Sequence, residues 1–207
     1  LHSFPTRRSS DLGGVYIADE VQSGFARLGE SMWGFSRHGV LPDIVTMGKP
    51  MGNGMPISGV VFRPEVCEEF GRNVRYFNTF AGSSIAVAAG AAVLDVFDAE
   101  NVQQRVLDNG RALRAGLEEI TRESPYVAEV RGSGLYVGVE LVKDRESLEP
   151  DRVLADHVIN DMRDRRVLIS GTGEAVNVLK IRPPLAFDSA DVTRFLETFA
   201  EIAETRL

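Results

Sequence analysis

Two short apolar segments, neither of them alternating with polar residues, most constrain what this chain can fold into. Residues 15–18 read VYIA and are followed by two acids, and residues 43–47 read DIVTM and are followed by glycines. An apolar run of this length without alternation is typical of a strand buried on both faces, as in a parallel sheet. Residues 57–62, ISGVVF, form a third candidate strand. The first part of the chain is therefore predicted to contribute buried strands to an α/β sheet.

Helical segments follow these strands. Residues 64–70 are predicted to form a short helix because Pro64 suits a first helical turn. The Ala- and Gly-rich residues 83–97 favour a helix packed closely against its neighbours. Residues 101–120 are predicted to form a longer amphipathic helix. Its apolar stripe consists of Val102, Val106, Leu113, Leu117 and Ile120.

From residue 126 onward, short strands and helices together predict a small α/β domain. The expected strands are residues 127–131, 135–142, 167–170 and 178–181. A helix is expected between the charged loop 143–151 and about residue 165. Asp188 is the expected N-cap of the last helix. The buried stripe of that helix consists of Val192, Phe195, Leu196, Phe199 and Ile202.

Residues 1–12, LHSFPTRRSSDL, do not fit this pattern, since they have no apolar period and carry two adjacent arginines. They resemble a translated sequencing-adapter scar, and the alternative is a genuine disordered tail. With these residues set aside, the chain opens directly on a strand and reads as the middle of something longer. The expected domains are residues 13–122, the C-terminal part of a large domain with its connecting helices, and residues 123–207, a small C-terminal domain.

Composition and charge argue against several classes of protein. Of the 207 residues, 43% are hydrophobic and 26% are charged, which is the balance of a soluble globular protein. The net charge of -7 gives no electrostatic case for binding nucleic acid or an anionic membrane. The chain has no apolar run of about 18 residues, so no transmembrane helix is expected. Cys67, the single cysteine, cannot form an internal disulfide, and a cytoplasmic location is expected.

Asp19 and Lys49 are the candidate catalytic residues. Each follows a predicted buried strand, and in open α/β sheets ligands bind outside the carboxyl ends of the strands. An acid and a lysine at that edge can face one bound molecule, and Gly48, Gly52 and Gly54 would let the backbone approach it closely. Two plainer interpretations stay open at this point: Asp19 is a cap or turn residue, and Lys49 is a solvated lysine in a glycine-rich loop.

Other motifs for cofactor or metal binding fail on inspection. Pro50 stands where a phosphate-binding P-loop needs Ser or Thr, and Ile57 stands where a dinucleotide fingerprint needs its third glycine. The histidines have no metal-ligand spacing, so no metal site is expected. These histidines are His2, His38 and His157.

Three long motifs resemble the consecutive motifs of the class III aminotransferases, which depend on pyridoxal 5'-phosphate (PLP). They read IADEVQSGFARLG, LPDIVTMGKPMGNGMPISGVV and FNTFAGSSIAVAAGAAVLDV, in the order and spacing of that family. The resemblance runs from residue 13 to the C-terminus. Within the family, the chain is most similar to the alanine–glyoxylate aminotransferase 2-like branch, which includes ethanolamine-phosphate phospho-lyase. The resemblance implies the PLP-dependent transferase fold type I, an α/β fold whose PLP-binding large domain would include residues 13–122.

The resemblance also implies a role for each matching residue. Asp19 matches the acid that pairs with the pyridine nitrogen of PLP and keeps the ring an electron sink. Lys49 matches the lysine that forms the Schiff base with the cofactor and then shuttles a proton. Gln22 matches a side chain near the phenolic oxygen of the ring, and Thr79 matches one that reaches the cofactor phosphate of the neighbouring subunit. In such a family the active site lies at the interface of a homodimer.

One departure from the family concerns the substrate. Many members have an arginine that clamps the substrate's α-carboxylate, three residues before the first proline of a C-terminal motif. Aligned on Pro183, Lys180 takes that place and Arg182 lies two positions on. Lysine is a point charge, whereas a guanidinium matches a planar carboxylate bidentately, so Lys180 favours a substrate with another anionic group, such as a phosphate. The alternative is a structural or solvated lysine, with Arg182 or another residue holding a carboxylate.

Three functions therefore stay open from the sequence. The first is an aminotransferase that moves an amino group between an amine or amino acid and an oxo acid. The second is a PLP-dependent phospho-lyase that acts on a phosphorylated amine. The family's N-terminal half supplies a phosphate-binding loop and an aromatic residue stacked on the PLP ring, and neither is recognised in this sequence. The third expectation is therefore a catalytically idle fragment.

Overall fold

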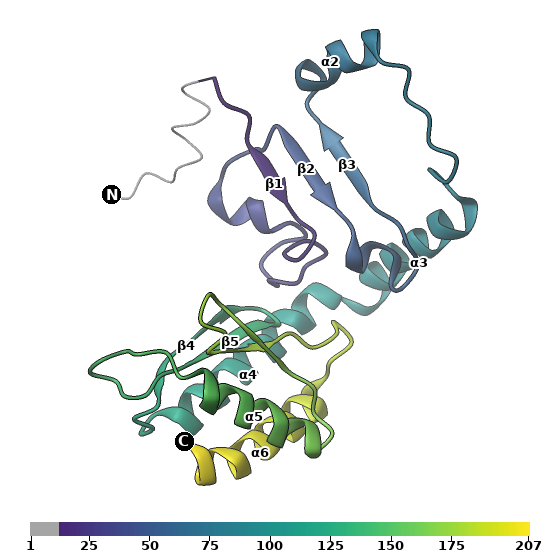
Figure 1. The fold of residues 1–207 in the computed structure, drawn as a ribbon. Helices are drawn as coiled ribbons and strands as arrows, with labels where there is room; N and C mark the ends of the chain where they lie inside the picture. Colours follow the sequence, from purple (N-terminus) through teal and green to yellow (C-terminus); the bar gives the residue numbers. More distant parts are fainter. Residues whose placement is uncertain (1–12) are drawn as a thin grey trace. The chain divides into compact units, whose positions relative to one another are not determined.

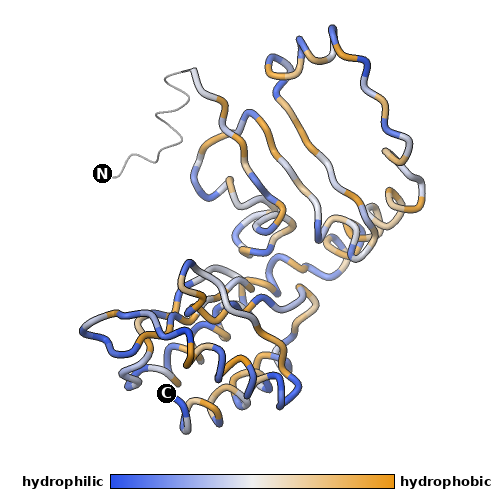
Figure 2. Tube along the Cα trace, in the orientation of Figure 1, coloured by the Kyte–Doolittle hydropathy of each residue, from blue (hydrophilic) through white to orange (hydrophobic). Residues whose placement is uncertain are grey.

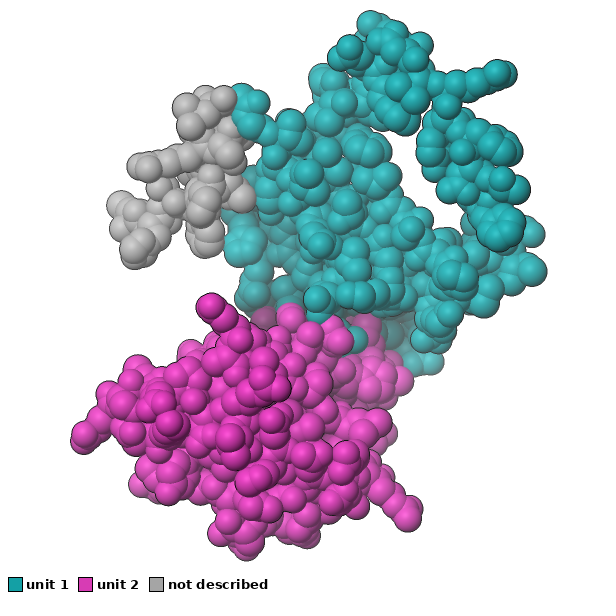
Figure 3. Space-filling model, viewed as in Figure 1, with its two compact units in different colours: residues 1–102 teal, residues 103–207 magenta. Residues whose placement is uncertain are grey.

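The computed structural model describes residues 13–207, so the expected adapter scar at residues 1–12 lies outside the described part. The chain divides into two compact units, Leu1–Val102 and Gln103–Leu207 (Figure 3). This division falls before the domain boundary expected at residue 122, because helix α4 (Val102–Thr121) packs within the second unit. In that helix, Gly110 lies against the backbone of Gly134, and Gly116 lies against the side chain of Leu196.

Unit 1 contains a three-stranded sheet in the order β1-β2-β3 (Figure 1). The strands are β1 (Ile17–Asp19), β2 (Ile44–Met47) and β3 (Gly59–Phe62). β1 and β2 run parallel, as predicted, whereas β3 runs antiparallel to β2. The helices are the short 3-10 segments η1 (Gly34–His38) and η2 (Lys49–Gly52), then α2 (Pro64–Asn73) and α3 (Ser84–Glu100).

The prediction that β1 and β2 are buried on both faces is wrong for this chain. Ile17 of β1 is 54% exposed, and every residue of β2 is only half-buried. The adjacent residues Val60 and Val61 of β3, which point to opposite faces of the sheet, are 47% and 56% exposed. Apolar residues run along β2, β3 and α3 (Figure 2), but the described part of unit 1 supplies too few elements to cover them. In the space-filling view, unit 1 is open between β3 and the residues that lead from α2 to α3 (Figure 3).

Unit 2 contains a four-stranded antiparallel sheet in the order β4-β5-β7-β6. The strands are β4 (Val127–Ser133), β5 (Tyr136–Leu141), β6 (Ser170–Thr172) and β7 (Val178–Ile181). Helices α4, α5 (Arg152–Asp164) and α6 (Ser189–Arg206) lie on one face of this sheet (Figure 1). Val137, Val139 and Leu141 of β5 are buried and alternate with residues of the open face, so the core of unit 2 lies between its sheet and its helices.

The ends of the elements in unit 2 follow the sequence closely, with one exception. β7 has the predicted bounds, and Asp188 caps α6 as predicted, since its side chain accepts hydrogen bonds from the N–H groups of Ala190 and Asp191. The predicted strand at residues 167–170 is wrong, because the paired strand β6 begins only at Ser170. Val167 instead donates its N–H to the Met162 carbonyl at the end of α5.

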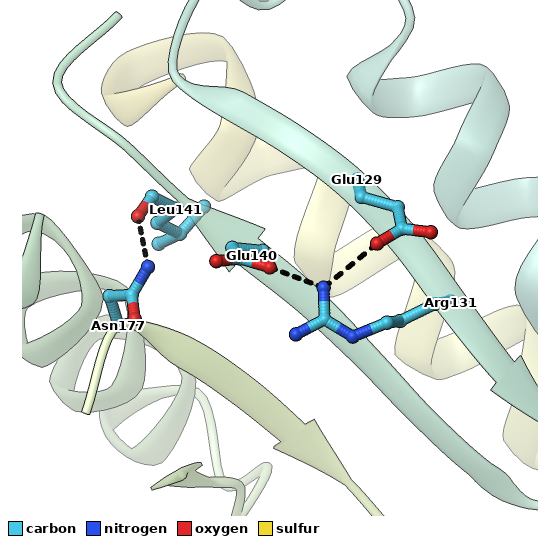
Figure 4. Close-up of polar contacts among 5 residues, drawn as sticks. All are labelled: Glu129, Arg131, Glu140, Leu141 and Asn177. Atoms are coloured by element: carbon cyan, nitrogen blue, oxygen red, sulfur yellow. Dashed lines mark hydrogen bonds and ion pairs between the residues drawn. The ribbon is translucent and has the colours of Figure 1, made fainter. Parts of the chain in front are cut away.

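Two groups of polar contacts link neighbouring segments of the sheet in unit 2 (Figure 4). Arg131 on β4 is paired with Glu140 on β5 and, at 3.0 Å, with Glu129. The hydrogen bond to Glu140, followed by weaker contributions from both carboxylates, raises the pKa of Arg131. The buried Asn177 donates its side-chain N–H to the Leu141 carbonyl at 2.7 Å, and the Leu141 N–H donates to the Asn177 carbonyl at 2.9 Å. Arg131 and Glu140 therefore connect β4 to β5, and Asn177 and Leu141 connect the residue before β7 to the end of β5.

Within residues 13–207, every helix is either too short or too polar to cross a bilayer.

Candidate active site

The parallel pairing of β1 and β2 brings Asp19 and Lys49 to one edge of the sheet of unit 1. Asp19 is the last residue of β1 and is paired in register with Thr46 of β2. β2 ends at Met47, and Lys49 follows two residues later as the first residue of η2. The carboxyl ends of both strands therefore meet at the edge where an open α/β sheet binds its ligand.

The carboxylate of Asp19 is held through one of its two oxygens. Oδ1 accepts the Val21 N–H at 3.1 Å and the Thr46 hydroxyl at 3.4 Å. Oδ2 accepts no hydrogen bond from residues 13–207, and the side chain is exposed. A carboxylate in this arrangement is oriented by the protein on one side and can accept an N–H from a ligand on the other.

Lys49 has an exposed side chain and a left-handed backbone conformation, with φ of 39°. A left-handed conformation is uncommon for a residue other than glycine and costs on the order of 1–3 kcal/mol. It persists here because η2 packs against α3 and because Gly52, on the same 3-10 turn, lies close against Ile57. Backbone strain of this kind is concentrated at functional sites.

Gln22 lies in the turn after β1, near the same edge, and its side chain is exposed. Thr79 lies elsewhere in unit 1, in the segment 74–83 between α2 and α3, and it is also exposed. The structure thus brings Asp19, Gln22 and Lys49 to one edge of the sheet. Within the described part of the chain, no hydrogen bond joins Thr79 to Asp19 or Lys49.

Lys180 and Arg182 belong to unit 2. Lys180 is half-buried in β7, where it is paired in register with Gly138 on one side and Ser170 on the other. Its neighbours Leu179 and Ile181 are buried, so Lys180 lies on the open face of the sheet. Arg182 lies just beyond the end of β7 and is exposed.

Thr46 is a residue of this site that the sequence analysis missed. It lies inside a strand that reads as apolar, and its contact with Asp19 depends on the register between β1 and β2. The single polar side chain within the run IVTM was the available signal. No cluster of three or more His, Cys, Asp or Glu side chains that could hold a metal ion occurs in residues 13–207.

Comparison with known proteins places this geometry in context. The family described as "Aminotransferase class-III" matches residues 10–203. A Drosophila melanogaster protein named "Alanine--glyoxylate aminotransferase 2-like" is 43% identical over 191 residues, which cover 91% of this chain and 39% of that protein. The chain therefore spans about two fifths of the length of this curated relative.

Solved structures with the same fold include two that differ in their reported chemistry. A phospholyase from Arthrobacter, in complex with phosphoethanolamine, has a TM-score of 0.92 and 44% identity, over 97% of this chain and 47% of that one. A Bacillus anthracis aminotransferase has a TM-score of 0.89 and 32% identity, over 96% of this chain and 46% of that one. These matches confirm the predicted α/β fold, in which the chain spans just under half of each solved structure.

Proposed function

Since the chain belongs to the class III aminotransferase family, we propose that it carries the lysine-bearing part of a PLP-dependent active site. The observation that carries the proposal is the meeting of Asp19 and Lys49 at the carboxyl edge of adjacent parallel strands. The family membership supports PLP as the cofactor. The whole enzyme's reaction and its homodimeric assembly are proposals as well, because the chain spans less than half of its relatives.

The side chains at this edge suit PLP chemically. The oxygen of Asp19 that has no partner in the described part of the chain is the acceptor that a protonated pyridine nitrogen needs. The exposed amine of Lys49 is the nucleophile that a cofactor aldehyde needs. Gln22 would lie near the phenolic oxygen of the ring, and Thr79 would reach the cofactor phosphate in the neighbouring subunit.

Each of these residues would have a defined task in catalysis. When bound, PLP supplies an electron sink that stabilises negative charge at the substrate carbon. Asp19 would hold a proton on the pyridine nitrogen through a charge-assisted hydrogen bond. The amine of Lys49 would carry the proton to and from the substrate carbon. The left-handed backbone at Lys49 would fix the base of this long side chain while leaving its amine able to move.

The leading proposal for the reaction is amino-group transfer between an amine or amino acid and an oxo acid. It is supported by the match to the aminotransferase family and by the relatives named as aminotransferases. A cytoplasmic location, expected from the single cysteine, stays a prediction.

A phospho-lyase acting on a phosphorylated amine is the second candidate. Its support is Lys180, which stands in place of the family's arginine clamp and lies on the open face of its sheet without an ion pair in the described part of the chain. The chain is also 44% identical to a phospholyase whose structure was solved in complex with phosphoethanolamine, about the same identity as to the Drosophila melanogaster relative named as an aminotransferase. A lysine can bind a phosphate as a point charge, whereas a carboxylate clamp normally uses the arginine fork.

The deciding experiment uses two chimeric enzymes, called restored enzymes below, in which this chain is joined to the N-terminal part of a related protein. In one, this chain replaces the matching part of the Arthrobacter phospholyase, and in the other it replaces the matching part of the Bacillus anthracis aminotransferase. Both are assayed with phosphoethanolamine for phosphate release and with alanine plus glyoxylate for transamination, with the parent enzymes as controls. An activity that appears in both restored enzymes is determined by this chain, since their remaining halves differ.

The results separate the two candidates. Transamination of alanine and glyoxylate in both restored enzymes, without phosphate release, would support the aminotransferase. Phosphate release in both, without transamination, would reject it in favour of the phospho-lyase. Lys180→Met is the matched variant, because it removes the charge and keeps the length of the side chain. It should lower phosphate release if Lys180 binds the substrate's phosphate, and it should leave that activity unchanged if Lys180 is only structural.

The third possibility, a catalytically idle fragment, concerns the 207 residues in isolation. Unit 1 by itself leaves its sheet largely uncovered, so we expect the isolated chain to bind no PLP. Titration of the isolated chain with PLP, followed by absorbance, tests this expectation. A stable yellow complex would contradict it.

A further inference from the structure

Glu20 is a buried carboxylate that the proposed chemistry does not use. It follows Asp19 directly and is only 2% exposed. Its Oε1 accepts the Phe35 N–H at 2.8 Å, and its Oε2 accepts the Gly34 N–H at 2.8 Å and the Ser23 hydroxyl at 2.7 Å. Among the described residues, no Lys or Arg forms an ion pair with it. Burying a carboxylate is costly unless its oxygens are hydrogen-bonded, and these three donors offset that cost.

These bonds close a loop between β1 and η1. The carboxylate joins the beginning of the loop, at Ser23, to its end, at Gly34 and Phe35. The two ends pack so closely that a Cβ atom added at Gly34 would lie 2.7 Å from the Cβ of Ser23. Such tight closure leaves the backbone between Glu20 and Ser23 little freedom to move.

The interior of the same loop stores backbone strain. Phe25 and Ala26 both have left-handed conformations, with φ of 56° and 54°, which residues with a Cβ rarely adopt. They are held by the Ala26 N–H, which donates to the Met32 carbonyl at 3.0 Å, and by the edge-on contact between the Phe25 and Trp33 rings. Strained backbone of this kind persists only where several contacts of the surrounding structure hold it in place. The hydrogen bonds of the Glu20 carboxylate are among the contacts that hold this loop.

The same backbone holds Asp19. Glu20 donates its own N–H to the Thr46 carbonyl at 2.9 Å, and the next residue, Val21, donates its N–H to Asp19 Oδ1. Glu20 is therefore fixed to β2 through its backbone and to η1 through its side chain. The amide that orients Asp19 lies directly beside this fixed point.

We propose that Glu20 is a positioning residue of the active site: its buried carboxylate fixes the backbone of residues 20–23, so that the Val21 amide holds Asp19 and Gln22 stays at the cofactor edge. The inference rests on the proposed function of Asp19 as the partner of the pyridine nitrogen. Glu20 itself would touch neither the cofactor nor the substrate.

Glu20→Gln tests this role with almost no change in shape. The three donors converge on two carboxylate oxygens, whereas glutamine offers one oxygen and one NH2 group. In either orientation, the NH2 group faces at least one N–H donor, so at least one bond is lost. Glu30→Gln is the matched control, since the same change falls in the same loop at an exposed ion pair with Arg37. Ser23→Ala is a milder variant that removes only the hydroxyl bond.

Two quantities are measured in the restored enzyme built from the Arthrobacter phospholyase: hydrogen exchange by peptide, and the dissociation constant of PLP from the apoenzyme. In Glu20→Gln, we expect faster exchange confined to residues 20–35. We also expect about a tenfold weaker PLP affinity, because binding must then re-order the loosened backbone at a cost comparable to one hydrogen bond to a charged group. Ser23→Ala should show a smaller change in the same direction, and Glu30→Gln should show none.

Two results would overturn the positioning role. One is a PLP affinity in both Glu20→Gln and Ser23→Ala that stays within about twofold of the unsubstituted value. The other is exchange that accelerates throughout the protein in both variants, which would make the carboxylate a general stabiliser of the fold. If the unsubstituted restored enzyme bound no PLP, the proposed function itself would fail. In that case, an unchanged rate of hydrogen exchange at residues 20–35 in Glu20→Gln would still refute the claim that the Glu20 carboxylate fixes this backbone.

Discussion

The Thr46 hydroxyl donates a hydrogen bond to Asp19 Oδ1 at 3.4 Å, across the register pair that these two residues form between β1 and β2. The Val21 N–H reaches the same oxygen at 3.1 Å. The orientation of the Asp19 carboxylate therefore depends on a neighbouring strand as well as on its own turn. Because a charge-assisted hydrogen bond is directional, this orientation should affect how firmly Asp19 can pair with a ligand.

Thr46→Val should weaken PLP binding by about three- to tenfold in a restored enzyme, because the substitution keeps the shape of the side chain and removes the donor. Thr46→Ser keeps the hydroxyl and should bind PLP nearly as well as the unsubstituted protein. The measurement is the dissociation constant of PLP, followed by cofactor absorbance. Equal affinities for the Val and Ser variants would show that the hydroxyl has no part in positioning Asp19.

Lys49→Ala should abolish covalent attachment of PLP and turnover, because Lys49 is the only lysine among the described residues of unit 1. Borohydride reduction of a restored enzyme, followed by peptide mapping, should find the cofactor on Lys49. Lys143→Ala is the control, since Lys143 lies in unit 2 and is exposed in an ion pair with Glu149. Label on Lys143 or Lys180 in the unsubstituted protein would refute the assignment.

The sequence predicted most reliably those features that depend on local pattern. β7 was predicted with its observed bounds, because an apolar run between turn residues identifies a short buried strand. Asp188 was identified as a helix cap because a short acidic side chain just before a helix satisfies its first N–H groups. Asp19 and Lys49 were expected at one sheet edge because each follows an apolar strand, and the parallel pairing of β1 with β2 places them there, while their roles stay predictions.

Features that depend on distant partners could not be predicted in the same way. Two of the three donors to Glu20, the N–H groups of Gly34 and Phe35, lie 14 and 15 residues further along the chain, in a 3-10 turn with no strong sequence signal. The contact of Thr46 with Asp19 required the register between two strands. The burial of β1 and β2 was overestimated, because an apolar sequence indicates that a strand should be covered and does not identify the elements that cover it.

Residues 103–207 should fold alone as a soluble monomer, whereas the isolated 207-residue chain should aggregate. Unit 2 has a continuous apolar core between its sheet and its helices, and few of its large apolar side chains are exposed. Unit 1, in contrast, exposes apolar residues over β3, α2 and the segment 74–83, and exposed patches and strand edges promote association. Size-exclusion chromatography of both chains checks this expectation, and a monodisperse 207-residue chain would contradict it.

The stability of unit 2 should depend on pH through Asp161 and Arg206, which join α5 to α6 at 2.7 Å. The hydrogen bond from Arg206, aided by the charges of Arg165 and His157, lowers the pKa of Asp161 in the folded state. The resulting stabilisation is present above the ordinary aspartate pKa and is lost as the pH falls through the lowered value.

Arg206→Met should therefore destabilise unit 2 at pH 7 by up to about 1 kcal/mol, a limit set by the partial exposure of the pair. Below the ordinary aspartate pKa of about 3.9, the difference from the unsubstituted chain should shrink as Asp161 becomes protonated. The measurement is urea unfolding of residues 103–207 at pH 7 and at a pH below about 3.9. Arg163→Met, which removes an exposed pair with Asp164, is the control and should have almost no effect. A difference that grows in acid would contradict the direction of the pKa shift.

Gly110→Ala should strongly destabilise unit 2, because α4 crosses the β4–β5 turn at that glycine with no room for a side chain. A Cβ atom there would lie 2.3 Å from the Gly134 carbonyl oxygen and 2.7 Å from its Cα. These are backbone atoms of a tight turn, so they cannot move aside as the end of a side chain can, and the helix must shift. Overpacking of this kind costs about 1–3 kcal/mol or more, which outweighs the gain of up to about 1 kcal/mol that alanine brings to a helix.

The measurement is urea unfolding of residues 103–207. The control is Arg111→Ala, an exposed substitution at the adjacent residue, which should change the free energy of unfolding by less than about 0.5 kcal/mol. A Gly110→Ala variant as stable as the unsubstituted chain would show that α4 does not approach the turn this closely.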